Sequence, residues 1–154
     1  MGRKSSTRAN RYNRWGCTLP YNASAMPNWC NEPPPPLLLE GISQFNHGEF
    51  FRQHETLEDL WRIETREVRR LYQGILQIGV AMHHISRCNH HGAVYMLTRG
   101  PSYLRPFCPV CQTVDVAHLL AQATHILVEV KRLGSDELKR FDWSLTPHVR
   151  LIPK

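Results

Sequence analysis

The chain has 154 residues, of which 42% are hydrophobic and 21% are charged, a composition typical of one soluble, globular domain. Its longest apolar run, residues 75–85, is interrupted by Gln77 and two histidines, so neither a transmembrane helix nor a membrane partner is expected. The formal net charge is +6 and is unevenly placed, because five basic residues against Glu32 alone give residues 1–36 a net charge of +4.

Residues 1–36 show no hydrophobic period and end in four consecutive prolines. We interpret them as a disordered basic arm with a stiff proline spacer, followed by a helical domain over residues 37–143 and a tail over residues 144–154. Such an arm is more often a solvated tail without a partner, and nucleic acid is the alternative, as a partner that would bind through this arm alone. The basic residues of the arm are Arg3, Lys4, Arg8, Arg11 and Arg14.

The chain has five cysteines, at positions 17, 30, 88, 108 and 111. An odd number, without a visible secretory signal, indicates a reducing compartment rather than a disulfide framework, so a cytoplasmic location is predicted. Cys108 and Cys111 have the spacing of redox and zinc motifs, but neither a thioredoxin-like context nor a second such pair accompanies them. We therefore expect ordinary loop cysteines.

Hydrophobic spacing predicts five helices in chain order, over residues 37–47, 49–63, 66–87, 89–99 and from 113 or 115 to 133. Gly48 and Gly134 end helices, Asn89 caps the fourth, and Gly100-Pro101 ends or kinks it. The expected fold is an all-α, five-helix bundle, built from two antiparallel hairpins and a long C-terminal helix.

A weak internal repeat supports the two hairpins. An offset of 40 residues places Gly48 over Cys88 and Leu57 over Leu97. The junction Gly-Glu-Phe-Phe-Arg-Gln resembles the one inside tetratricopeptide hairpins, but two imperfect copies are too few for such an array. The repeat therefore predicts hairpin packing only.

The second predicted helix carries polar residues on its core-facing side. His54 and Glu58 are four residues apart and share one face with Trp61, while Glu55 lies at its border. Burial of an ion without partners costs far more than an exposed pair of this spacing gains. His54 and Glu58 therefore need partners from another helix or from a ligand.

Gln73 and Gln77 of the third helix are the expected partners, because they share one arc of that helix. A buried His/Glu/Gln cluster between the second and third helices is thus predicted. It either fixes how the helices pack or serves as the site of a small binding or scaffold module.

A divalent metal is the one cofactor that this pattern suggests, with His54, Glu58 and His84 as its ligands. The alternative function is therefore a metal-dependent, hydrolase-like enzyme that uses the same cluster. A carboxyl group in an aromatic pocket suits general acid catalysis, but no nucleophile motif or phosphate-binding loop accompanies it.

Two motifs stand in the order and spacing of a known family. They are Phe-Asn-x-Gly-Glu-Phe-Phe-x-x-His-Glu-x-Leu-Glu-x-x-Trp at residues 45–61 and Leu-Tyr-Gln-Gly-Ile-Leu-Gln at residues 71–77. On these motifs the chain resembles the bacterial and archaeal family called domain of unknown function 309, over about residues 37–133. The resemblance implies a small all-helical bundle. It places these residues on motif positions: His54, Glu55, Glu58, Trp61, Gln73 and Gln77.

The chain departs from the family at Gln53, where alanine is usual, and at Cys88, where glycine is usual. The basic arm lies outside the resemblance. No activity comes with the family, so the ligand, a protein or small-molecule partner, and the oligomeric state stay open.

Overall fold

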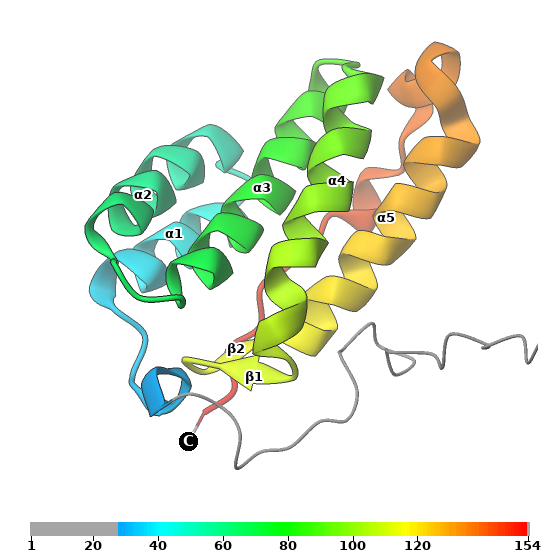
Figure 1. Cartoon of the computed structure of the whole chain (residues 1–154). Coiled ribbons are helices and arrows are strands. Elements are labelled where there is room, and N and C mark those ends of the chain that lie inside the picture. Colours follow the sequence, from blue (N-terminus) through cyan, green and yellow to red (C-terminus); the bar gives the residue numbers. More distant parts are fainter. Residues whose placement is uncertain (1–27, 154) are drawn as a thin grey trace, which may run out of the picture.

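The structure is a computed structural model that describes residues 28–153. Five α-helices follow one another in this part of the chain: α1 (Pro36–Asn46), α2 (Phe50–Ile63), α3 (Arg69–Ser86), α4 (His90–Leu104) and α5 (Val116–Glu137). α3 and α4 lie side by side at the centre, with α1 and α2 on one side and α5 on the other (Figure 1). The predicted five-helix bundle is confirmed. None of the described helices is long and apolar enough to cross a membrane.

The turn between α1 and α2 explains why the chain reverses at Gly48. Gly48 has a φ angle of +76°, a conformation that glycine adopts without a Cβ penalty. Its N–H donates to the carbonyl oxygen of Phe45 at 3.0 Å, and the N–H of Glu49 donates to that of Gln44 at 2.9 Å. These two bonds are those of a Schellman motif, which satisfies the last carbonyl groups of the helix.

The turn between α3 and α4 repeats this geometry 40 residues later. Cys88 has a φ angle of +54° and donates its N–H to the carbonyl oxygen of Ile85 at 3.0 Å. The N–H of Asn89 donates to the carbonyl oxygen of His84 at 2.8 Å, and the Asn89 side chain accepts from the N–H of Gly92. The two helix ends predicted to be equivalent therefore have the same backbone hydrogen bonds.

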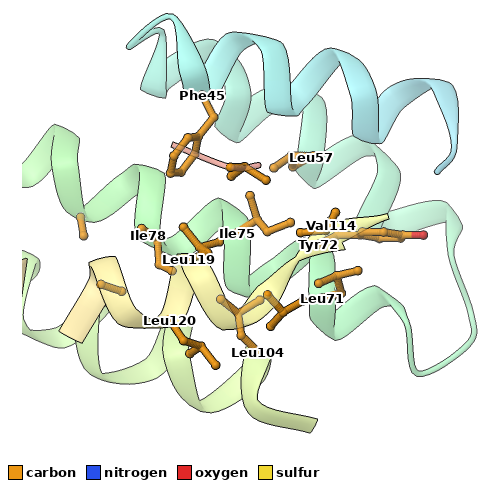
Figure 2. Close-up of a cluster of buried hydrophobic side chains, with 14 of the residues drawn as sticks. Phe45, Leu57, Leu71, Tyr72, Ile75, Ile78, Leu104, Val114, Leu119 and Leu120 are labelled. Carbon is orange, nitrogen blue, oxygen red and sulfur yellow. The ribbon is translucent and has the colours of Figure 1, made fainter. Parts of the chain in front are cut away.

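Apolar side chains from all five helices form one core (Figure 2). Phe45, Leu57, Ile75, Leu104 and Leu119 are each 0% exposed, and each comes from a different helix. Burial of such side chains contributes about 1.5–3 kcal/mol apiece, so this core accounts for most of the favourable free energy of folding. The hydrophobic period used to predict the helices thus corresponds to the surfaces that they bury.

A small hairpin separates α4 from α5, in the region where Cys108 and Cys111 were expected to lie in a loop. Strands β1 (Val110–Cys111) and β2 (Val114–Asp115) pair antiparallel. Their two-residue turn, Gln112-Thr113, has φ angles of +47° and +63°. Hairpin turns of this kind usually contain asparagine or glycine, so the sequence lacked the usual signal. The C-terminal segment packs against the hairpin, where Leu151 bridges to Val114.

The prediction for the cysteines is wrong. Cys30 and Cys111 form a disulfide, Cys108 is disulfide-bonded as well, and among the described cysteines only Cys88 is free. Disulfides are typical of oxidising compartments. The prediction of a cytoplasmic location therefore loses its support from the cysteine count.

The disulfide also changes the expected start of the folded part. Asn28–Asn31 form a short 3-10 helix, η2, in which Cys30 is buried. The backbone N–H of Gln112 donates to the carbonyl oxygen of Cys30 at 2.8 Å, and its side-chain amide donates to that of Trp29 at 3.2 Å. Residues 28–36, which were assigned to the disordered arm, are thus attached to the bundle. The rest of the predicted arm lies outside the described residues.

The end of α4 differs from the prediction, whereas the end of α5 agrees with it. α4 continues through Pro101 to Leu104 instead of ending at Arg99, and both Gly100 and Pro101 are buried. At Gly134 the φ angle is +68°, so the regular part of α5 stops at the predicted glycine. A proline removes only one hydrogen bond from the helix ladder, and packing against α3 compensates for that loss.

Candidate functional site

One half-buried stripe of α3 faces α2, and we call the surface between them the α2–α3 seam. Its residues on α3 follow helical spacing: Arg69, Gln73, Leu76, Val80 and His83. At one end the Arg69 guanidinium lies 4.2 Å from the ring centroid of Trp61. At the other end the His83 ring lies 6.3 Å from that of Phe51. The seam therefore runs the length of both helices.

His54 and Glu58 lie together on α2, beside the seam, as their spacing predicted. His54 Nε2 is 3.4 Å from Glu58 Oε2, and Arg62 donates to Glu58 Oε1 at 2.7 Å. The side chains of His54 and Glu58 are 38% and 33% exposed. The pair therefore reaches solvent, and the prediction that it is buried is wrong. Glu55, one residue along the helix, is exposed to solvent.

The predicted glutamine partners do not meet this pair. Gln73 lies on the seam, but no hydrogen bond joins it to His54 or Glu58 among the described residues. Gln77 points the other way, because its Cβ lies 3.4 Å from the position that a Cβ at Gly100 of α4 would occupy. α3 is central and contacts both α2 and α4, so a shared polar arc did not decide which neighbour each glutamine faces.

A glutamine outside the predicted cluster connects the two helices instead. Gln53 is 0% exposed, and its Nε2 donates to the carbonyl oxygen of Leu76 at 3.1 Å. Its side-chain amide lies where a Cβ on Gly79 would be, so the absence of that Cβ makes room for it. Position 53 is one of the two at which a departure from the resembled family motif was noted in the sequence.

The predicted set of three metal ligands is not brought together. His84 lies at the α3–α4 turn, where its Nδ1 is 3.2 Å from the side-chain nitrogen of Asn89. Burial, together with the neighbouring His83, lowers the pKa of His84, so neutral imidazole is favoured. Across residues 28–153 no three histidine, cysteine, aspartate or glutamate side chains are arranged to hold a metal ion.

Arg69 is the cation of the seam that the sequence analysis missed. Its guanidinium stacks on Trp61, and Nη2 donates to the Trp61 carbonyl oxygen at 3.3 Å. Nε is buried and has no acceptor, and no carboxylate in residues 28–153 pairs with this arginine. Arg62 follows Glu58 by four residues and could have been found from that spacing. Arg69 stands across a loop from Trp61, where spacing carries no information.

At the His83 end the seam opens into a hollow of about 580 Å³. Phe51, Met82 and Trp143 form much of its wall, and Phe51 and Trp143 are 62% and 45% exposed. The seam thus has a cationic end at Arg69 and an apolar end at this hollow.

The segment that carries the seam matches a family. Residues 38–96 match the family described as Domain of unknown function (DUF309). This is less than half of the chain and ends within α4, so the resemblance is confirmed but is shorter than the expected extent to residue 133. An uncharacterized protein of Aquifex aeolicus (strain VF5) is 33% identical over 54 residues, which are 34% of this chain and 16% of that protein. The chain thus covers a small part of that relative's length. No solved structure matches the chain.

Proposed function

We propose that the domain is a small helical binding module and that its α2–α3 seam binds a carboxylate or phosphate group. The observation that carries the proposal is Arg69, a half-buried guanidinium that is stacked on Trp61 and has no carboxylate partner in the described part of the chain. A planar guanidinium held in this way loses little freedom when it binds an anion through paired hydrogen bonds.

The charges around Arg69 favour an anion. Arg62 already pairs with Glu58, and His54 lies on the other side of the same carboxylate. The negative charge of Glu58 is thus offset within α2, and the positive charge of Arg69 remains. The residues of the seam named here all lie within residues 38–96, the segment that matches the family.

Residue-resolved NMR of the full chain, titrated with succinate and separately with inorganic phosphate, tests the proposal. We expect saturable shifts of the Trp61 indole N–H and of the Arg69 side chain, which disappear in Arg69→Gln. Arg132→Gln is the matched control, because Arg132 is an exposed arginine on α5 that pairs with Glu129. Shifts that stay unchanged in Arg69→Gln, or no saturable shifts at all, would refute an anion site in the seam.

The metal-dependent enzyme is the second candidate, and the close approach of His54 to Glu58 is the observation that favours it. The two side chains could supply two ligands to one divalent ion, with further positions left to substrate or water. A titration with Zn²⁺ tests this role in the same spectra. Binding that is lost in Glu58→Gln but kept in Arg69→Gln would favour the enzyme over the anion-binding module.

A further inference from the structure

A second surface, on α4 and away from the seam, combines aromatic rings with an arginine. Tyr95, Arg99 and Tyr103 follow one another at intervals of four residues and therefore lie on one face of the helix. The Arg99 guanidinium donates to both tyrosine hydroxyl groups, and its bond to Tyr103 is 2.7 Å long. It also lies 5.3 Å and 5.7 Å from the two ring centroids. Among the described residues, Arg99 is thus held in place by rings and hydroxyls rather than by a carboxylate.

Tyr103 also borders a hollow of about 380 Å³. Trp29 and Phe107 line it, with their ring centroids 5.5 Å apart and their planes tilted by 54°. Arg70 of α3 lies over the Tyr103 ring at 5.3 Å and also borders the hollow, as does the carboxylate of Glu67. Three of the seven residues that line the hollow are thus aromatic, and Arg70 gives it a cation.

This surface lies at the end of the bundle where the described part of the chain begins. η2, which contains Trp29, lies beside the β1–β2 hairpin, at the end of the bundle where α4 finishes (Figure 1). The chain enters the described part at residue 28, next to Trp29. The preceding sequence contains five basic residues between positions 3 and 14 and no acidic residue. The chain therefore joins its most basic segment to the bundle beside the hollow.

We propose that this surface binds single-stranded nucleic acid. One base stacks in the hollow against Trp29, Tyr103 and Phe107, and the adjoining phosphates lie on Arg70 and Arg99. Stacking on aromatic rings combined with a basic path for the backbone is how sequence-tolerant single-strand binding works. A hollow of this volume falls in the range that accepts small planar ligands. Paired bases are stacked inside a duplex and cannot enter it.

The proposal separates this surface from the basic arm and from the seam. Electrostatic attraction through the arm alone would not depend on Tyr103 or Arg99. Binding of an anion in the seam would not depend on them either, because Arg69 faces α2 while Arg70 contacts the Tyr103 ring of α4.

Fluorescence anisotropy of labelled U12 and dT12 with the full, oxidised chain tests the proposal. We expect saturable binding that weakens as salt rises. Arg99→Gln should reduce the slope of log K against log salt by about 0.7, the value for one phosphate contact on a single strand. Tyr103→Ala should weaken binding by about fivefold or more. Arg140→Gln, which changes an exposed arginine that pairs with Glu137, is the matched control and should leave both quantities unchanged.

Three results would overturn the proposal. They are no saturable binding of either oligonucleotide, equal binding of a 12-base-pair duplex, and binding that Arg99→Gln and Tyr103→Ala leave unchanged. In the last case, loss of binding in the double variant Arg8→Gln/Arg11→Gln would assign the affinity to the arm alone. Circular dichroism of each variant shows that it is folded. If Tyr103→Ala proves unfolded, Tyr103→Leu replaces it, since leucine keeps the apolar bulk but not the aromatic face.

Discussion

The strained residue at the α3–α4 turn allows a quantitative test of the fold. Cys88 has a φ angle of +54°, where a side chain other than that of glycine costs about 1–2 kcal/mol. Glycine would remove this cost but would add about 0.5–1 kcal/mol of backbone entropy lost on folding. The Cys88 side chain is exposed, so little burial is lost. Cys88→Gly should therefore raise the free energy of unfolding by about 0.5–1 kcal/mol.

Equilibrium urea unfolding under non-reducing conditions measures this change. For a chain of this length, 1 kcal/mol corresponds to about 2–4 °C in Tm, so thermal unfolding gives a second reading. Cys88→Ser removes the thiol and keeps the backbone strain, and it should change stability by less than about 0.5 kcal/mol. Gly48→Ala introduces the strain at the equivalent turn, where φ is +76° and there is open space for a Cβ, and should destabilise by about 1 kcal/mol. If Cys88→Gly is neutral or destabilising while Gly48→Ala destabilises, the two turns are not energetically equivalent.

Three further changes test the interior. Gly79→Ala should lower the free energy of unfolding by about 1–3 kcal/mol, because the new Cβ overlaps the buried Gln53 amide, and Gln53→Ala in that background should restore most of the loss in urea unfolding. Tyr72→Phe should cost about 1–2 kcal/mol, because it removes the 2.8 Å hydrogen bond to Gln112 and leaves a buried acceptor without a donor. Burial raises the pKa of Tyr72 to about 12, so its contribution to stability is complete below about pH 10 and is lost as pH rises through 12. The difference in phenolate absorbance between the wild type and Tyr72→Phe should therefore titrate near pH 12. Cys30→Ser opens a disulfide between residues 81 apart in sequence and should cost about 2–4 kcal/mol; an unchanged urea midpoint would mean that η2 adds nothing to the fold.

The sequence predicted the bundle well because its apolar residues repeat with the helical period. Leu38, Ile42 and Phe45 define the first helix in the sequence, and all three are buried in the structure. Helix ends were predicted where a local signal marks them, as at Gly48 and Asn89. α4 ran past its predicted end because packing around Pro101 outweighs the local preference of proline.

The candidate site was predicted only in part, because periodicity fixes faces but not neighbours. It placed His54 beside Glu58 correctly, since both lie on one helix. The helical period did not predict that Gln77 faces α4, nor that Arg69 stacks on Trp61, which lies across a loop. The disulfide was also not predicted. An odd number of cysteines does not argue against disulfides when one thiol, at Cys88, is free.

The pairing of Gln53 with Gly79 shows how a departure from a family motif can be accommodated. Position 53 corresponds to Ala93 in the second hairpin, and both residues are 0% exposed. A small side chain suffices there, whereas glutamine brings an amide that must find room and a partner. Gly79 supplies the room because it lacks a Cβ, and the carbonyl oxygen of Leu76 supplies the acceptor. Neither residue can then be interpreted alone: alanine at 53 leaves a void beside Gly79, alanine at 79 leaves no space for Gln53, and only the double change removes both faults. A double-mutant cycle should therefore give a coupling energy well above the few tenths of a kcal/mol, about 0.3–0.5, within which independent sites add.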